Sequence, residues 1–294
     1  MTQLLGLDIG TSKAKALVFD RQGRLKAKES IDSYSTDTPH PRWAEQEPDQ
    51  WWEAAKEVLS RIVKNPEVET EAIAGIGLTG QMHGPVFLDR DGKPLRSCMI
   101  WSDTRAQKQS KWISRKVPNI TNITGNPPAP GYTAPKIIWL RENEPDLYEK
   151  TWKVLLPKDY IRYRLTGEIC TDPSDSSGTL LQEIQSGEWS REILEELEIS
   201  PKLLPSIKDS STIRGKIKSE LASKFGFQED IPVAVGGGDL ATGLIGNGAV
   251  KKGRAAITVG TAGQVLVPEP EPREDLFGNR SEEHTSELQS PSAI

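Results

Sequence analysis

The chain opens with three consecutive strands, and this order restricts its fold more than any other feature. Residues 4–9 are mostly apolar and end in a Gly-Thr-Ser turn, and apolar residues then recur with the two-residue period of a strand over 14–20. A turn at 20–23 leads into a third strand over 24–34. Because a Rossmann domain passes from its first strand directly into a helix, the sequence predicts an antiparallel three-stranded start instead.

Helical and strand patterns follow along the rest of the chain. The strongest helix pattern covers residues 49–65, where apolar residues fall on one face at 3.6-residue spacing. We also predict a hairpin from 85–88 and 95–101, and a helix over 102–116 capped by Ser102 or Asp103. The remaining predictions are buried strands at 72–78, 231–235 and 255–259, and two helices within 135–165.

Composition excludes several classes of protein. The net charge of −5, from 42 acidic against 37 basic residues, argues against nucleic acid and anionic membranes as partners. Cys98 and Cys170 lie far apart and the three histidines are scattered, which argues against a structural zinc site. No apolar run approaches the roughly 20 residues of a membrane helix, and the start lacks the pattern of a signal peptide, so we expect a cytoplasmic protein.

Two turns have the composition of a phosphate cradle. In Asp8-Ile9-Gly10-Thr11-Ser12, Gly10 permits a tight turn, Thr11 and Ser12 add hydroxyls, and Asp8 suits Mg²⁺. Residues 260–263, with Gly260, Thr261 and Gly263, repeat this logic after another strand. Each turn taken alone is equally typical of a plain connection between strands, so the pair carries more weight than either member.

A triple glycine precedes a single carboxylate at the end of the strand at 231–235. Gly236-Gly237-Gly238 leaves room for a ligand to approach the backbone, and Asp239 follows at once. A kinase that phosphorylates a hydroxyl needs a group that orients and deprotonates it, which a carboxylate can do. The alternative is that Asp239 caps the next helix, and both roles are compatible.

Two further segments suit a polyol. Gln81, Met82 and His83 stand between glycines after a buried strand, although a lone histidine is more often structural than a ligand. Trp101 suits stacking on a sugar, and Asp103 suits hydrogen bonds to its hydroxyls, with a core tryptophan before a capped helix as the alternative.

These motifs, in this order, resemble the FGGY family of carbohydrate kinases, and its xylulokinase branch in particular. The resemblance runs from about residue 4 to about 267 and is strongest in the loop 80–84. It also rests on the segments 43–48, 50–52, 155–160 and 236–239, together with the turn 8–12.

The resemblance implies an α/β fold of the actin-like ATPase (ribonuclease H-like) type, with a mixed sheet flanked by helices. The implied activity is ATP- and Mg²⁺-dependent phosphorylation of a pentulose such as D-xylulose, or of another sugar or polyol, with a non-catalytic sugar binder as the competing class. By resemblance, Asp239 is the catalytic base, Met82 and His83 contact the sugar, and Asp8 serves the metal. Thr11, Ser12 and the loop 260–263 line the phosphates.

The sequence departs from the family at two positions, and it also lacks most of the family's second domain. Leu240 stands where the family often has Asn or Gln, and Lys13 stands where a small residue is common, so that it either approaches a phosphate or points to solvent. We expect residues 1–245 to form the sugar-binding domain and 246–279 to begin an incomplete second actin-like, nucleotide-binding domain. Residues 280–290 resemble a translated sequencing adapter, so we expect 280–294 to be non-native and the chain to be a truncated fragment without useful kinase activity. The resemblance leaves open a homodimer of the full-length protein.

Overall fold

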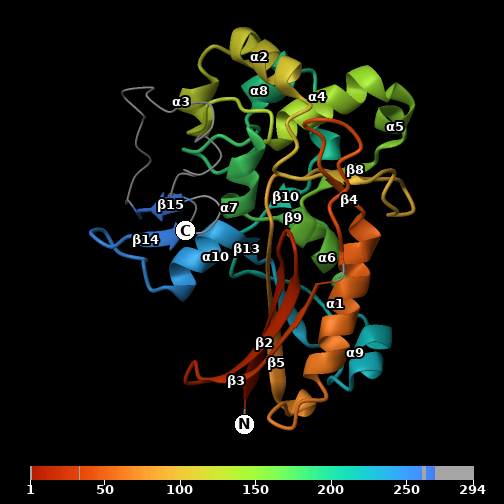
Figure 1. The fold of residues 1–294 in the computed structure, drawn as a ribbon, viewed down its shortest axis with the longest axis vertical. Helices are drawn as coiled ribbons and strands as arrows, with labels where there is room; N and C mark the ends of the chain where they lie inside the picture. Colours follow the sequence, from red (N-terminus) through yellow and green to blue (C-terminus); the bar gives the residue numbers. More distant parts are fainter. Residues whose placement is uncertain (1, 33, 260–262, 269–294) are drawn as a thin grey trace.

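The computed structural model describes residues 2–32, 34–259 and 263–268. Its centre is a mixed sheet with the strand order β11-β12-β5-β1-β2-β3, to which β13 adds beside β5 (Figure 1). The strands of this sheet are β1 (Gln3–Ile9), β2 (Ala14–Asp20), β3 (Leu25–Ile31), β5 (Ile73–Gly80), β11 (Ile213–Lys216), β12 (Pro232–Ala234) and β13 (Gly237–Gly238). The pairs β1–β2 and β2–β3 are antiparallel, which confirms the predicted opening.

One face of the sheet carries the larger apolar core. Alternate residues of β1 are buried, whereas Leu4 on the opposite face is half exposed. Three helices supply the covering side chains: α1 (Pro48–Ile62), α6 (Pro157–Thr166) and α9 (Ser219–Phe225). The helix α1 begins with a proline in its first turn and buries Trp51, Trp52 and Leu59, as its 3.6-residue pattern predicts.

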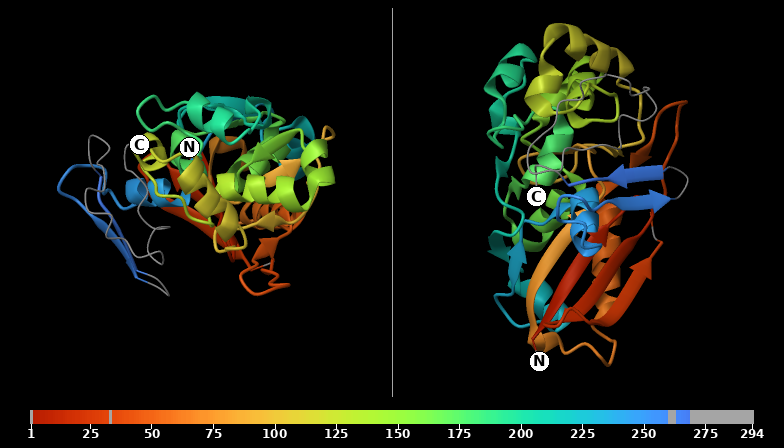
Figure 2. Two further views of the ribbon diagram at one scale, coloured as in Figure 1. Left: turned by 90° about the horizontal axis from the view of Figure 1, so that it is seen from above. Right: turned by 90° about the vertical axis from the view of Figure 1, so that its left-hand side faces the viewer.

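A second apolar core lies in the helical part above the sheet in Figure 1, and Figure 2 shows the same separation from the side. Its helices are α2 (Gln107–Lys116), α3 (Ile120–Thr124), α4 (Thr133–Asn143), α5 (Pro145–Lys150) and α8 (Arg191–Glu196). Short strand pairs brace this part: β4 (Glu45–Gln46) with β7 (Cys98–Met99), β6 (Val86–Leu88) with β8 (Lys153–Leu155), and β9 (Cys170–Thr171) with β10 (Ser206–Ile207).

The remaining elements lie outside the central sheet. They are α7 (Pro173–Ser176), α10 (Asp239–Gly246), the hairpin β14 (Ala256–Val259) with β15 (Gly263–Leu266), and the 3₁₀ turns η1 (Thr70–Ala72), η2 (Ser177–Thr179) and η3 (Pro201–Leu203). Figure 2 shows the β14–β15 hairpin projecting beside α10, away from the central sheet. No helix in the described part of the chain is long and apolar enough to span a bilayer.

Three local predictions differ from the structure. The strand predicted to be buried at 255–259 forms β14 of the hairpin beside α10, where Ile257 is 69% exposed. The segments 85–88 and 95–101 are joined by a tight antiparallel turn, with Leu95 N donating to Phe87 O at 2.8 Å and a single bridge between Leu88 and Pro94, but the pairing does not extend along the whole predicted hairpin. Beyond this turn, β6 pairs with β8 and β7 pairs with β4. The helix predicted from 102 begins at Gln107, since the Asp103 carboxylate accepts the backbone N–H of Arg105 and holds this stretch in a turn.

Candidate active site

Three strands end side by side, and the predicted motifs follow directly from their ends. β1 and β13 both run parallel to β5, with Asp8 and Gly237 each opposite Thr79. Since parallel strands end at the same edge of a sheet, Asp8, the loop 81–83 and Asp239 meet there. Contact is close: a side chain at Gly238 would place its Cβ 2.8 Å from the Met82 Sδ. The structure thus brings together the two motifs on which the predicted sugar site depends.

Asp8 has one paired and one unpaired carboxylate oxygen. Its Oδ2 accepts a hydrogen bond from Lys15 Nζ at 2.9 Å, because the β1–β2 register places the two residues opposite each other. Its Oδ1 is buried and has no hydrogen-bond partner among the described residues. The ammonium beside the Asp8 carboxylate therefore belongs to Lys15. Lys13, which was predicted to approach a phosphate or point to solvent, forms an ion pair instead, with its Nζ 3.1 Å from Asp32 Oδ1.

Asp239 is the first residue of α10 and has an altered pKa. The carboxyl is open to solvent, yet it sits in a recess where protein atoms displace part of its hydration. The loss of hydration in this recess is the larger cause, and the negative charge of Asp8 the second, of a rise in the pKa of Asp239 to about 6. A carboxylate with a raised pKa accepts a proton more readily, which suits the predicted role of general base.

His83 is held as a neutral ring. Burial lowers the pKa of His83 to about 4, and its Nδ1 lies 2.7 Å from the carbonyl oxygen of Gly178. A carbonyl can only accept, so Nδ1 carries the ring proton and donates it to Gly178. The backbone of His83 adopts φ +67°, and its carbonyl accepts a hydrogen bond from Thr133 Oγ1 at 2.9 Å. The tautomer and the orientation of this ring are therefore fixed.

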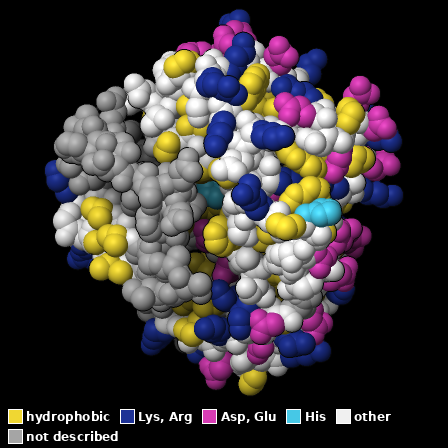
Figure 3. Space-filling model, turned by 45° about the horizontal axis from the view of Figure 1, so that its top comes forward, with side chains coloured by type: hydrophobic (Ala, Val, Ile, Leu, Met, Phe, Trp, Pro, Cys, Tyr) yellow, Lys and Arg dark blue, Asp and Glu magenta, His cyan; other side chains and the backbone are white. Residues whose placement is uncertain are grey.

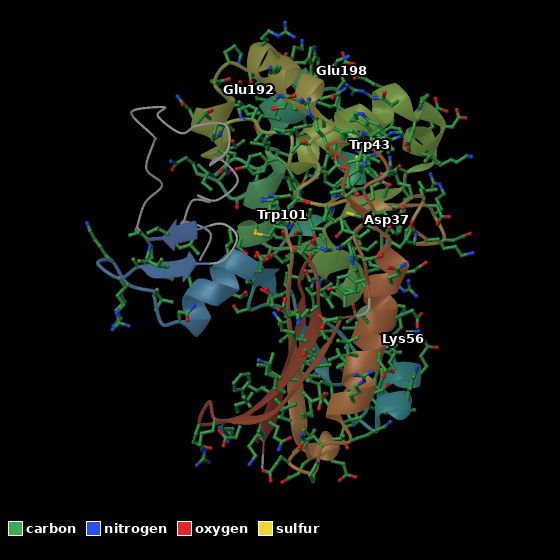
Figure 4. All side chains as sticks on the ribbon, viewed as in Figure 1. Asp37, Trp43, Lys56, Trp101, Glu192 and Glu198 are labelled. Carbon is green, nitrogen blue, oxygen red and sulfur yellow. The ribbon has the colours of Figure 1, made fainter. Side chains whose placement is uncertain are left out.

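A hydrogen bond joins Trp101 to the turn that follows β1. Trp101 Nε1 donates to Thr11 Oγ1 at 2.9 Å, and the indole is 42% exposed, so that it presents a surface to a ligand. Figure 4 shows Trp101 beyond the ends of the sheet strands, close to the helical part. Gly10 closes its turn by donating to the carbonyl of Lys13, while Ser12 is exposed. Of the second predicted cradle, Gly260 and Thr261 lie outside the described residues, and Gly263 begins β15.

Asp103 and Gln81, both predicted to contact the sugar, form hydrogen bonds with other groups of the protein. Asp103 is fully buried, and its two oxygens accept from Arg105 and from the backbone N–H of Ala44 at 2.7 Å. These bonds correct the prediction that Asp103 contacts the sugar: it holds the loop beneath Trp101 instead. Gln81 donates to Gln46 Oε1 at 2.8 Å, while its own Oε1 is buried without a hydrogen-bond partner among the described residues.

A buried ionic cluster behind the site was missed at the level of sequence. Asp159, Asp172 and Asp175 surround Lys158, and all four side chains are fully buried. Burial, opposed by Lys158 and reinforced by the neighbouring carboxylates, raises the pKa of Asp175 well above its usual range. The missed signal was the density of aspartates at 172–175 and the polar pair inside the apolar run 155–161.

The described residues fit Mg²⁺ bound together with a nucleotide. They contain no group of three or more side chains able to hold a metal alone. Mg²⁺ usually keeps several waters and binds one or two carboxylates plus substrate phosphates, so the unpaired oxygen of Asp8 is a suitable donor. Figure 3 shows acidic side chains and a histidine in a hollow of the surface beside the residues drawn in grey.

The fold and this arrangement define a class of protein. Residues 3–246 match the FGGY family of carbohydrate kinases, N-terminal domain, and the chain belongs to this family. The solved structures to which this chain is similar are sugar kinases, which confirms the predicted actin-like ATPase fold.

Particular relatives include xylulose kinases. The chain is 36% identical over 259 residues to the xylulose kinase of Escherichia coli K12, a match that covers 88% of this chain and 53% of the relative. The xylulose kinase of Rhodospirillum rubrum superposes with a TM-score of 0.88 at 27% identity, over 93% of this chain and 56% of the other. The gluconate kinase of Lactobacillus acidophilus superposes with a TM-score of 0.84 at 27% sequence identity, over 90% of this chain and 53% of the other. The chain thus spans about half the length of the relatives it matches.

Proposed function

We propose that this chain forms the sugar-binding half of an ATP-dependent pentulose kinase whose acceptor is D-xylulose. The observation that carries the proposal is the convergence of β1, β5 and β13, because it places Asp8, Met82–His83 and Asp239 at one edge of the sheet. The xylulose kinases among the relatives support the choice of sugar. The gluconate kinase with a similar fold makes another sugar the alternative.

The proposed chemistry follows from the side chains. Asp239 orients a sugar hydroxyl and takes its proton as the hydroxyl oxygen forms a bond to the γ-phosphorus of ATP, and the bond from that phosphorus to the bridging oxygen breaks to release ADP. In this proposal, Asp8 and Lys15 lie beside the phosphate oxygens of ATP, which carry the negative charge of the transition state. Mg²⁺, when bound, neutralises phosphate charge. His83 offers a ring of fixed tautomer, and Trp101 offers an exposed aromatic face to the sugar.

The side chain of Leu240 is not available to hydrogen-bond the sugar. The side chain is half buried and packs against the small apolar cluster of Leu244, Ala249 and Leu266. It therefore stabilises α10 from the side of the β14–β15 hairpin and supplies no hydrogen bond to a hydroxyl. We infer that sugar recognition depends more on the loop 81–83 than on residues after Asp239.

Sugar binding and phosphotransfer test separate parts of the proposal. We expect titration calorimetry to show that the chain binds D-xylulose more tightly than D-gluconate or glycerol. Asp239→Asn keeps the shape of the site, so the chain that carries it should retain sugar binding. In a full-length form with the same substitution, ATP-dependent formation of ADP in the presence of D-xylulose should fall by about 10²-fold or more, the usual contribution of a general base. Tighter binding of D-gluconate would overturn the choice of sugar, and full turnover in Asp239→Asn would overturn the role of the carboxylate.

A further inference from the structure

The segment 155–160, one of the motifs that define the resemblance, has no part in the chemistry proposed above. The structure shows what its polar residues contact. Lys158 is fully buried, and its Nζ lies 2.6 Å from Asp159 Oδ1 and 3.0 Å from Asp172 Oδ1. A buried ammonium needs charged partners, so this ion pair fixes the carboxylate of Asp172 inside the protein.

Asp172 in turn holds the hydroxyl of Ser174. The Asp172 Oδ2 accepts hydrogen bonds from the Ser174 backbone N–H at 2.9 Å, from the Ser174 hydroxyl, and from Ser210 Oγ at 2.9 Å. A serine hydroxyl has one proton to give, and here it goes to Asp172. The lone pairs of Ser174 Oγ are thereby directed to accept another hydrogen bond.

That second bond reaches the peptide directly before the proposed base. The backbone N–H of Gly238 donates to Ser174 Oγ at 2.9 Å, and both residues are buried. Gly237 and Gly238 have no side chains that packing could fix, and β13 is only two residues long. Hydrogen bonds to this backbone therefore decide where Asp239 lies, and Figure 1 shows α7, which carries Ser174, close to β13.

We propose that Ser174 is a positioning residue: anchored by the buried Lys158–Asp172 pair, it fixes the Gly238–Asp239 peptide and so aims the Asp239 carboxylate at the sugar. The role in aiming rests on the proposed function, whereas the fixed peptide does not. Three regions distant in sequence, 155–160, 172–176 and 236–239, thus act as one support for the site. Ser174 itself does not touch the substrate in this proposal.

The test compares Ser174→Ala with two matched variants of the whole chain. Ser174→Thr keeps the hydroxyl and should restore the wild-type behaviour. Ser176→Ala is the control, because Ser176 is an equally buried serine of the same helix whose hydroxyl donates to Asp172 O at 2.8 Å and does not contact Gly238. The first measurement is amide hydrogen exchange by NMR at Gly238, and the second is the dissociation constant for D-xylulose by calorimetry, both at a temperature where every variant is folded.

We expect exchange at Gly238 to be about tenfold faster or more in Ser174→Ala, and close to wild type in Ser174→Thr and Ser176→Ala. Affinity for D-xylulose should fall by about tenfold in Ser174→Ala alone, because a displaced Asp239 carboxylate loses its hydrogen bond to the sugar, a bond that Asp239→Asn would keep. Equal exchange at Gly238 in Ser174→Ala and Ser176→Ala would overturn the proposal. If the wild-type chain does not bind D-xylulose, the proposed function fails, yet the exchange comparison still decides whether Ser174 fixes the peptide.

Discussion

The glycines that precede Asp239 should respond very differently to the same substitution. Gly236 has φ +84°, and a Cβ there would lie 2.2 Å from the carbonyl oxygen of Leu78 in β5. Gly238 has no positive φ, and its Cβ would meet the flexible end of Met82, with Sδ at 2.8 Å. Gly236→Ala therefore strains the backbone of the sheet, whereas Gly238→Ala displaces a side chain of the proposed sugar site.

The size of the first effect follows from two costs. An L-residue other than glycine in the left-handed region loses about 1–2 kcal/mol. Forcing a methyl group into a packed site costs about 1–3 kcal/mol more, and Leu78 O cannot retreat because β5 is paired on both sides. We expect Gly236→Ala to lower the free energy of unfolding by about 3 kcal/mol. Gly238→Ala should cost about 1 kcal/mol or less, because the end of Met82 can rotate away.

Urea unfolding followed by tryptophan fluorescence measures these differences. With a slope of about 3 kcal/mol per molar urea, Gly236→Ala should shift the midpoint down by about 1 M. Gly243→Ala is the control, because it lies inside α10 with open space around it and should stabilise the protein by about 0.5–1 kcal/mol. D-Xylulose binding should weaken in Gly238→Ala and stay unchanged in Gly243→Ala. A loss below about 1 kcal/mol in Gly236→Ala would refute the reasoning, since strain alone predicts more.

Two further predictions concern aspartates whose pKa is raised. Burial and neighbouring carboxylates raise the pKa of Asp175, so its ionisation opposes folding, a penalty that is absent at low pH and grows as the pH rises through the folded-state pKa. Asp175→Asn should thus raise the free energy of unfolding more at about pH 8 than at about pH 4 in urea titrations, and an equal gain at both would contradict this. For Asp239, carboxyl ¹³C NMR should show a pKa above its usual 3.8 without divalent cations. Added Mg²⁺ should lower that pKa if it binds beside Asp8, and no change would argue against this metal site.

The elements nearest the N-terminus could be predicted from local sequence. The two-residue period of β1–β3 and the 3.6-residue period of α1 reflect burial on a single face, and local order is enough to reveal it. The positions of the site motifs were also predictable, because Gly, Asp and hydroxyl residues directly after an apolar strand stand out in a sequence. The convergence of Asp8, Met82 and Asp239 at one edge supports that prediction.

The partner of each site residue was harder to predict. Lys15 could have been found from the register of a tight β1–β2 hairpin, since Asp8 and Lys15 stand opposite each other around the turn. The burial of Asp103 could not, because one of its partners, the backbone N–H of Ala44, lies 59 residues away in sequence. Strand pairing was only partly predictable for the same reason: β6 keeps a single bridge to the nearer segment at Pro94, but its ladder is with β8, more than 60 residues later.

The sequence by itself determined the meander, the main helices and the strand-end motifs, since each depends on residues close together in the chain. Only the tertiary structure decided how Lys158, Asp172 and Ser174 support the Gly238–Asp239 peptide, and which glycine of the triple is strained against β5. These features depend on contacts between segments far apart in sequence. No local pattern encodes such contacts, because their free energy appears only when the sheet assembles.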